Sequence, residues 1–460
     1  MKIVMAFVLM VTALAMAHAQ TLTRTEIDSS DTLQQTSPRL RTLYTFAGGS
    51  DGGDVESGVV IGSGGVLYGT TFNGGIDVCY SGCGTVFSLT PPASPGGAWT
   101  ESVLYRFKGG PSDGTNPVAR VVIGSGGVLY GTTKYEYPGN TSAPCGSAGC
   151  GTVFSLTPPA SPGGAWTETV LHTFTSSGGD GAYPCAGVVI SKRGVLYGTT
   201  YGGGTSGYGT VFSLTPPASP GSAWTETVLH TFTSSGGDGA NPMAGVVFGK
   251  GGVLYGATQL GGNSNLCNGG CGTVFSLTPP ASPGPWTETV LHEFAGGSDG
   301  DGATPSAGVV IGSGGVLYGA TSGGGTSGYG TVFSLTPPAS PGGAWTESVL
   351  YSFKGSPSDG TNPNLDGVVI GTGGVLYGAT VTGGTVHPSC GIPGCGVAFQ
   401  LTPPASPGGV WTETVLHDFT SGSDGVSPNG LVIGSGGMLY GTTYGGGGAL
   451  GWGTVFALKP

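Results

Sequence analysis

Gly-Val-Leu-Tyr-Gly-Thr-Thr, at residues 65–71, is the stretch that decides the fold, because close copies of it recur along the whole chain. Seven copies are present, one with Met438 in place of the valine, and their tyrosines are Tyr68, Tyr130, Tyr197, Tyr255, Tyr318, Tyr377 and Tyr440. Spacings of 58 to 67 residues predict one supersecondary unit copied in tandem, each copy burying its apolar face on its neighbours. A residue present in every copy serves the fold first, so the repeat indicates architecture rather than chemistry.

Each repeat contains four strand-like segments, named a to d, which in the first copy are residues 58–62, 66–71, 84–90 and 99–107. Segments b to d carry β-branched and aromatic residues, and segment a is short, apolar and bounded by glycine, which suits the crowded position nearest an axis. Ser-Gly-Gly between a and b predicts a tight turn. The Pro-rich stretch between c and d cannot continue a sheet. Four antiparallel strands per unit predict the blades of a β-propeller.

The two ends of the repeat predict how the ring closes. The repeat begins at Arg41 with Arg-Thr-Leu-Tyr-Thr-Phe, which matches the end of a segment d, and the last copy stops at a segment c, residues 453–458. We therefore expect an all-β, seven-bladed propeller over residues 41–460. An N-terminal outer strand would complete the last blade in a 3+1 arrangement and remove the open sheet edges.

The repeated segments Gly-Val-Leu-Tyr-Gly-Thr-Thr, Gly-Gly-Gly and Gly-Thr-Val-Phe-Ser-Leu resemble the GloVer (Gloeo/Verruco-type) tandem repeat of secreted bacterial proteins, over roughly residues 41–460. The resemblance implies an extracytoplasmic location and no established activity. Members often carry a C-terminal sorting anchor, and this sequence shows none. The strand order, with Trp-Thr opening segment d, is also similar to that of Kelch blades.

Composition and the N-terminus predict the compartment. Lys2, an apolar run over residues 3–16 and Ala17-His18-Ala19 predict a signal peptide over residues 1–19, followed by a flexible polar leader over residues 20–40. Only 8% of residues are charged and the net charge is −11, which argues against nucleic acid and anionic membranes as partners. We expect a secreted, extracellular or periplasmic monomer without a membrane span.

Eight of the nine cysteines form four close pairs in the loops between segments b and c. The pairs are Cys79 with Cys83, Cys145 with Cys150, Cys267 with Cys271, and Cys390 with Cys395. In the other three repeats the position of the second cysteine is aromatic: Tyr208, Tyr329 and Trp452. In an exported protein this pattern predicts disulfides, and zinc, which wants four ligands, is the alternative. Cys185 is unpaired and reads as a small buried residue.

An Asp-Gly follows segment d in all seven repeats. We interpret it as an Asx-type turn that directs the chain back to the axis. The alternative is a ring of carboxylates able to hold calcium. The loops with extra oxygen atoms would be the calcium sites, and their candidate ligands are Asp51, Asp54, Glu56, Asp299 and Asp301.

Two further recurring residue types are interpreted as structural. The glutamates of Trp-Thr-Glu sit on the outer segment d, too far apart to act as the paired carboxyl groups of a glycosidase. Histidine and tyrosine exchange with one another at the end of the same segment, as expected for a packing position. The histidines are His172, His230, His292 and His417, and the tyrosines are Tyr44, Tyr105 and Tyr351.

A ligand site in so regular a ring should break the symmetry. The irregular polar residues are Asp54, Glu56, Arg120, Lys134, Glu136, Lys192, Arg193, Gln259, Asp366 and His387. Loops d–a and b–c are expected to share one face, where aromatic residues would offer a surface to sugar or peptide. The candidate binding residues there are Phe72, Lys134, Tyr135, Glu136, Tyr137, Tyr201 and Tyr444.

Three functions fit the sequence. A secreted, non-catalytic binding protein for glycan or protein is favoured by the uniform blades and by the lack of a paired acid and base; no cofactor is expected except possible calcium. An extracellular hydrolase or lyase would need a cluster of unlike polar residues at the channel mouth. A structural matrix protein would fit the near-identical repeats.

Overall fold

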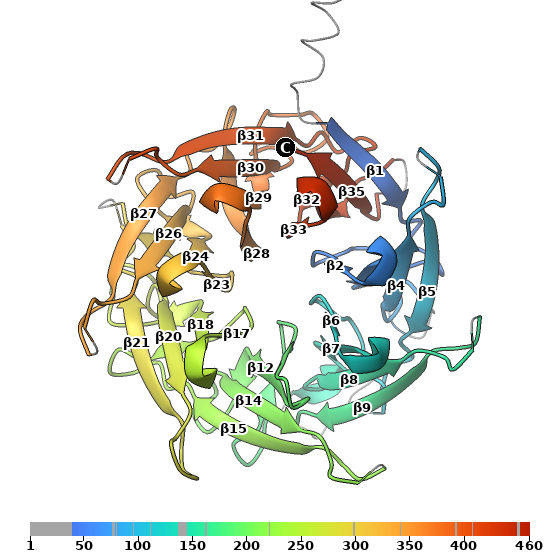
Figure 1. Cartoon of the computed structure of the whole chain (residues 1–460), viewed down its shortest axis with the longest axis horizontal. Coiled ribbons are helices and arrows are strands. Elements are labelled where there is room, and N and C mark those ends of the chain that lie inside the picture. Colours follow the sequence, from blue (N-terminus) through green and yellow to red (C-terminus); the bar gives the residue numbers. More distant parts are fainter. Residues whose placement is uncertain are drawn as a thin grey trace, which may run out of the picture.

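The computed structural model describes residues 39–460, except 76–78, 80, 95, 111, 137–144, 162, 220, 298, 299, 341, 392, 407, 449 and 450. The expected signal peptide and nearly all of the expected leader lie outside the described residues. Seven small antiparallel sheets surround a central axis as the blades of a β-propeller, with four strands per blade (Figure 1). The predicted fold is confirmed. Among the described residues, no helix has the length and apolar character needed to cross a membrane.

The strands of the first six blades run from the axis outwards in chain order, and in the seventh blade the N-terminal strand β1 is the outermost. The innermost are β2 (Val60–Ile61), β6 (Val122–Ile123), β11 (Val189–Ile190), β17 (Val247–Phe248), β23 (Val310–Ile311), β28 (Gly360–Ile370) and β33 (Val432–Ile433). The second are β3 (Leu67–Thr71), β7 (Leu129–Thr133), β12 (Leu196–Thr200), β18 (Leu254–Thr258), β24 (Leu317–Thr321), β29 (Leu376–Gly383) and β34 (Leu439–Gly445). The third are β4 (Thr85–Thr90), β8 (Thr152–Thr157), β14 (Thr210–Thr215), β20 (Thr273–Thr278), β26 (Thr331–Thr336), β30 (Val397–Thr402) and β35 (Thr454–Lys459). The outermost are β5 (Thr100–Arg106), β9 (Thr167–Thr173), β15 (Thr225–Thr231), β21 (Thr287–Glu293), β27 (Thr346–Ser352), β31 (Thr412–Asp418) and β1 (Arg39–Thr45).

Short elements complete the blades. Two-residue ladders beside the inner strands are β10 (Gly181–Ala182) with β13 (Gly202–Gly203), β16 (Gly239–Ala240) with β19 (Leu260–Gly261), and β22 (Gly302–Ala303) with β25 (Gly323–Gly324), while β32 (Val426–Pro428) pairs with β34. In six blades the turn between the first and second strands is a 3₁₀ turn that ends in Gly-Gly: η1 (Ser63–Gly65), η2 (Ser125–Gly127), η4 (Lys250–Gly252), η5 (Ser313–Gly315), η6 (Thr372–Gly374) and η7 (Ser435–Gly437). A further turn, η3 (Gly146–Ala148), lies in a b–c loop.

The ring closes as predicted, through β1. This N-terminal strand pairs antiparallel with β35 near the C-terminus, with Arg39 opposite Lys459 and Thr45 opposite Thr454. It therefore supplies the outer strand that the seventh blade would otherwise lack (Figure 1). This pairing covers the outer edge of β35 with a strand of the same chain.

Adjacent blades are held together by a repeated contact between phenylalanines. The Phe that directly follows each outer strand packs against the Phe of the third strand in the next blade, as Phe107 packs edge-on against Phe154 at 5.2 Å between ring centroids. The same contact joins the seventh blade to the first, where Phe46 meets Phe87 at 5.0 Å. Both rings of each pair are buried, so the hydrophobic core is divided among the interfaces between blades.

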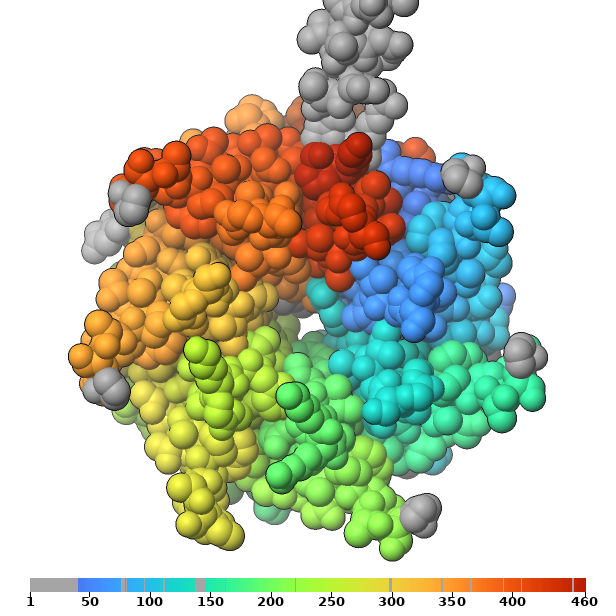
Figure 2. Space-filling model, in the orientation of Figure 1, coloured from blue at the N-terminus to red at the C-terminus, as the bar shows by residue number. Residues whose placement is uncertain are grey.

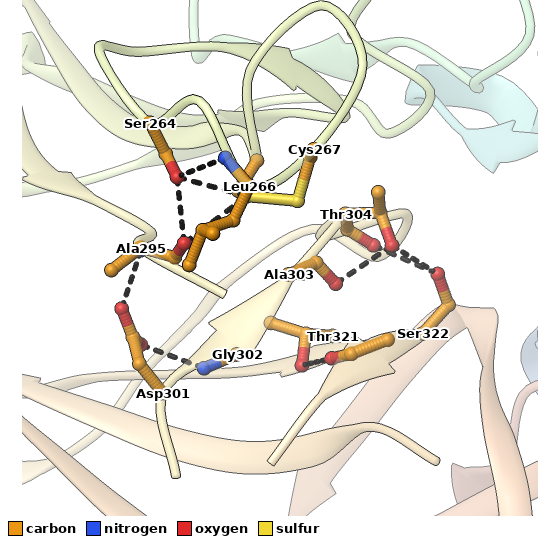
Figure 3. The surroundings of a disulfide bond; sticks show 12 residues. Ser264, Leu266, Cys267, Ala295, Asp301, Gly302, Ala303, Thr304, Thr321 and Ser322 are labelled. Atoms are coloured by element: carbon orange, nitrogen blue, oxygen red, sulfur yellow. Dashed lines mark hydrogen bonds between the residues drawn. A yellow bond between two sulfur atoms is a disulfide. The ribbon is translucent and has the colours of Figure 1, made fainter. Parts of the chain in front are cut away.

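The four predicted disulfides are confirmed, with Cα–Cα distances of 5.0 to 5.3 Å. Each fixes a b–c loop whose last cysteine also holds the next d–a loop. The carbonyl oxygen of Cys271, for example, accepts the backbone N–H of Thr304 at 2.7 Å, and Figure 3 shows the two loops side by side. The aromatic residues Tyr208, Tyr329 and Trp452 use their carbonyl oxygens in the same way. A disulfide in four blades and an aromatic residue in the other three therefore stand at the same place, where the b–c loop holds the next d–a loop.

Candidate binding site at the channel mouth

The d–a loops are built on the repeated aspartate. In every blade its carboxylate accepts the backbone N–H of the residue after the terminal Phe and lies against the Tyr or His ring of the same outer strand. Asp113 accepts the Lys108 N–H at 2.7 Å and the Tyr105 hydroxyl at 3.1 Å, and Asp180 lies 3.3 Å from His172 Nε2. Histidine and tyrosine can thus replace one another at this position because both can donate a hydrogen bond to the aspartate. Their role is therefore polar as well as the packing role that we expected.

The candidate calcium ligands have other partners. Asp51 accepts the Ala47 N–H and the Tyr44 hydroxyl, Asp301 accepts the N–H groups of Ala295 and Gly302 (Figure 3), and Asp54 accepts the Asn73 amide. Asp299 lies outside the described residues. Within the part of the chain that the structure describes, no three His, Cys, Asp or Glu side chains come together as a metal site would require. Calcium binding therefore stays a prediction from the sequence.

Two rings of residues form the channel mouth on the d–a/b–c face. The first ring consists of residues with left-handed backbone conformation, which in six blades precede a proline: Asp54, Asn116, Tyr183, Asn241, Thr304, Asn362 and Ser427, with φ between 52° and 58°. The second consists of the residues that directly follow the Thr at the end of the b segment: Phe72, Lys134, Tyr201, Gln259, Ser322, Val381 and Tyr444. In five blades the N–H of the second-ring residue donates to the carbonyl of the first-ring residue, as Tyr201 donates to Tyr183 at 3.0 Å.

The first ring has two residues that the left-handed region disfavours. Asn and Asp tolerate this region, whereas a bulky or β-branched residue there is an outlier. Thr304, with φ of 52°, donates its hydroxyl to the Ala303 carbonyl at 2.7 Å. Tyr183, with φ of 58°, packs its ring edge-on against Tyr135 at 5.9 Å. Backbone strain at a bulky aromatic residue points to a role for its ring beyond folding.

The second, third and fourth blades bring their irregular residues together in one pocket. This mouth pocket has a volume of about 450 Å³ and is lined by Lys134, Tyr135, Tyr183, Cys185, Tyr201, Met243 and Gln259. Three of the predicted binding residues (Lys134, Tyr135 and Tyr201) are thus brought together, and Tyr183, Cys185 and Met243 join them. The pocket combines aromatic walls with an ammonium and an amide, the composition of a small-molecule site.

Burial and the charge of Lys134 set the protonation of the titratable groups around the pocket. Burial raises the pKa of Glu56 to about 7, while Lys134 opposes that rise. Burial alone would lower the pKa of Lys134, but Cys185, Tyr135 and Glu56 raise it overall, so the ammonium stays charged. Burial raises the pKa of the Cys185 thiol to about 11. Cys185 is therefore a neutral, apolar wall residue rather than a nucleophile.

The remaining predicted binding residues lie outside this pocket. Glu136 is buried, with its carboxylate held by the backbone N–H groups of Cys150 and Gly151, so it is a loop-packing residue. Phe72 and Tyr444 occupy the second ring in the first and seventh blades, and Tyr444 is exposed. Tyr137 lies outside the described residues. Lys192 and Arg193 lie in the turn between β11 and β12, and His387 in the b–c loop of the sixth blade.

An ion pair crosses the axial region beneath the mouth. The inner position held by Gly in six blades is Arg120 in the second blade, and a neighbouring small residue is replaced by Asp366 in the sixth. Arg120 Nη2 lies 2.8 Å from Asp366 Oδ1, while Asp366 Oδ2 accepts the N–H groups of Gly58 and Gly430. We name this group the axial clasp, because it joins the first, second, sixth and seventh blades.

An axial channel of about 310 Å³ remains beside the clasp, lined mainly by the first five blades. Figure 2 shows the molecule hollowed at its centre. Channel and mouth pocket share Cys185 and Met243 in their walls.

The sequence profile of the Gloeobacter/Verrucomicrobia repeat matches residues 31–269 and 139–389. The chain belongs to this repeat family. The resemblance noted in the sequence is thereby confirmed, and four disulfides point to an oxidising compartment such as the periplasm or the cell exterior. No curated protein shows significant similarity to this family member.

Solved structures share the fold with this repeat-family member at low identity. A fungal alcohol oxidase in complex with copper is 14% identical with a TM-score of 0.51, covering 92% of this chain and 76% of the other. A luciferin-regenerating enzyme is 12% identical with a TM-score of 0.41, covering 92% and 96%. A Trypanosoma rangeli sialidase in complex with sialic acid is 10% identical with a TM-score of 0.39, covering 92% and 58%. These likenesses concern the propeller fold alone.

Sequence reasoning missed Tyr183 and Met243 as site residues. The signal for Tyr183 was present, because Tyr183-Pro184 stands where other repeats have Asn-Pro or a small residue before Pro. Its importance depends on the left-handed conformation of that position, which the repeat alignment alone does not display.

Proposed function

We propose that this propeller is a secreted, non-catalytic binding protein that holds a carbohydrate in the mouth pocket. The observation that carries the proposal is the gathering of Tyr135, Tyr183 and Tyr201 in one concave pocket with Lys134 and Gln259. Tyrosine offers a flat apolar face together with a polar hydroxyl, which suits the apolar face and hydroxyl groups of a sugar. The amide of Gln259 adds a donor and an acceptor.

A carbohydrate is favoured over a protein partner by size. A pocket of about 450 Å³ falls in the range of small-ligand sites. A stable protein interface would instead bury roughly 800 Å² on each partner over a broad surface. The disulfides and the signal-like N-terminus support exposure to extracellular glycans.

The test is a glycan array followed by calorimetric titration of the best-binding glycan. Tyr201→Ser places in the third blade the residue that the fifth blade carries at Ser322, and we expect it to weaken binding at least tenfold. Tyr444→Ser is the matched control on the same ring outside the pocket, and it should bind like the unaltered protein. An array without any bound glycan, or equal losses in the two variants, would contradict the proposal.

A hydrolase or lyase is the second candidate, and Glu56 is the observation that favours it. A carboxyl group whose pKa is about 7, in the wall of the axial channel and interacting electrostatically with Lys134, has the character of a general acid or base. The glycans bound on the array should therefore be incubated with the protein and analysed for shortened or unsaturated products. Product formation that disappears in Glu56→Gln would replace the non-catalytic proposal.

A further inference from the structure

The mouth pocket adjoins the axial channel. The two cavities have Cys185 and Met243 in common in their walls, and the channel has a volume of about 310 Å³. Cys185 is a neutral thiol and Met243 a flexible thioether. A ligand seated against the tyrosines therefore lies next to the channel at these two uncharged side chains.

The channel differs from the mouth in chemistry. Its wall on the third, fourth and fifth blades is formed by Val189, Val247 and Val310 with small residues between them. Cavities lined by such side chains favour apolar occupants over water. The apolar wall is the larger part of the channel.

The channel also has charged groups in its wall. Glu56, Arg120 and Asp366 belong to the first, second and sixth blades. Burial raises the pKa of Glu56, and the charge of Lys134 partly opposes that rise. Arg120 and Asp366 neutralise one another, and the second carboxylate oxygen of Asp366 is already bonded to two backbone N–H groups. The axial clasp therefore has no unpaired charge that would attract a charged ligand.

The chemistry of the channel wall limits the occupant. The hydroxyl groups of a second sugar ring would find few hydrogen-bond partners along Val189, Val247 and Val310, and burying them unpaired would cost free energy. An unbranched apolar group has no polar atoms to leave unpaired.

Granted the carbohydrate site proposed above, we infer that the ligand is a glycoside whose unbranched apolar aglycone lies in the axial channel. The sugar occupies the mouth pocket against the tyrosines. The chain passes Cys185 and Met243 and lies along the valines of the innermost strands. The ligand class is thus an amphiphile such as an alkyl or acyl glycoside.

The experiment is calorimetric titration with methyl, butyl and octyl β-D-glucopyranoside and the matching β-D-galactopyranosides, below micelle-forming concentrations. Each added methylene buried in the channel should raise affinity about fourfold. Met243→Glu places a carboxylate at the junction, at the register where the first blade carries Glu56, and should abolish the dependence on chain length. Met243→Ser is the milder second variant, and it should reduce the dependence of affinity on chain length. Val381→Glu adds the same charge on the mouth face outside both cavities and should leave it intact.

Equal affinity for methyl and octyl members, absence of binding by the octyl glycosides, or an unchanged length dependence in Met243→Glu would overturn the inference. The two proposals fail separately. Binding of chain-free glycans with no gain from the alkyl chain removes the channel site and leaves the carbohydrate site. A length dependence that is the same for both sugars, with no glycan bound on the array, removes the carbohydrate site and leaves the channel site.

Discussion

At the residue scale, the second glycine of Gly-Val-Leu-Tyr-Gly-Thr-Thr is fixed by a phenylalanine ring. Gly69 pairs with Phe87 on the neighbouring strand, and a Cβ at Gly69 would lie 2.5 Å from the end of that ring. The ring is in turn packed against Phe46 of the adjacent blade. Around it, Leu67 is buried and the Thr70 hydroxyl donates to the Ala119 carbonyl of the next blade at 3.0 Å. Leu67, Gly69 and Thr70 of the motif thus serve the contact between blades.

Gly69→Ala should therefore destabilise the protein although it adds one methyl group. The ring of Phe87 cannot move freely, so we expect a loss of about 1–3 kcal/mol in the free energy of unfolding. Gly49→Ala is the control, because a Cβ there meets no atom within 4 Å, and its effect should stay within about 0.5 kcal/mol. Chemical denaturation measures both, and equal stability of the two variants would contradict the packing account.

At the element scale, the outer strands carry glutamates that face the d–a turn of the preceding blade. Burial is the main cause that raises the pKa of Glu168 to about 8, with the Asp113 carboxylate adding to it and Lys108 opposing it. Glu101, Glu288, Glu347 and Glu413 have pKa values raised to about 7 for the same main reason. One carboxylate oxygen of each is buried without a hydrogen-bond partner among the described residues. These glutamates are structural, as expected, but they make the interfaces sensitive to pH.

The sign of that sensitivity follows from proton linkage. The folded protein holds protons on these glutamates up to pH 7 or 8, whereas the unfolded chain releases them near pH 4.5. Their contribution to stability is therefore complete below about pH 4.5 and is lost as the pH rises towards 8. The turn aspartates that lie beside a histidine act oppositely. Hydrogen bonds from His172 and Thr175 outweigh burial and lower the pKa of Asp180. The pKa values are lowered in the same way for Asp238, Asp301 and Asp424. Their contribution is present above about pH 3.8 and is lost in stronger acid.

We expect the Tm to be higher at pH 5 than at pH 8, measured by scanning calorimetry. Glu168→Gln should flatten this slope because it removes one titrating group from an interface between blades. Glu293→Gln changes an exposed glutamate and should leave the slope as it is. A Tm that rises from pH 5 to pH 8 would show that the buried carboxyl groups do not govern the interfaces.

At the scale of the whole molecule, stability depends on the closure of the ring by β1. At the closing interface the ring of Phe46 packs against Phe87, with 5.0 Å between centroids. Phe232 makes the same contact with Phe275 at an interface between two consecutive blades, at 5.2 Å. Phe46→Ala and Phe232→Ala should thus cost the same, about 3–5 kcal/mol each. Urea denaturation compares them. A nearly silent Phe46→Ala beside a costly Phe232→Ala would mean that the ring is open in solution.

The axial clasp adds a second connection across the same seam. Asp366→Ala leaves Arg120 and two backbone N–H groups without their partner, so we expect a loss of about 2–4 kcal/mol. The double variant Arg120→Gly with Asp366→Ala returns both positions to the residues of the other blades and should cost less than the single variant. If the double variant were less stable than Asp366→Ala, the loss in the single variant could not be explained by an unpaired Arg120 alone.

Most of the architecture could be predicted from the sequence because the same unit is repeated seven times. The strand order, the 3+1 closure and the disulfides all follow from comparing copies, and all are confirmed. The clasp was not predictable, because it depends on one additional residue between Pro363 and Gly367 in the sixth blade and one fewer between Pro428 and Gly430 in the seventh. These two changes in loop length bring Arg120 and Asp366 together only in the folded ring, where residues of different blades meet at the axis. The mouth pocket was found in part, because Lys134 and Tyr135 break the repeat visibly, while Met243 replaces one apolar residue with another.

The most direct test of the binding account is hydrogen–deuterium exchange with and without the best-binding glycan of the array. The account predicts slower exchange in peptides containing residues 183–185 and 201–203, which form the walls of the mouth pocket. The equivalent peptides around residues 427–429 and 444–446 in the seventh blade should be unchanged. Protection spread evenly over all seven blades, or confined to the seventh, would contradict the claim that function resides where the second, third and fourth blades depart from the repeat.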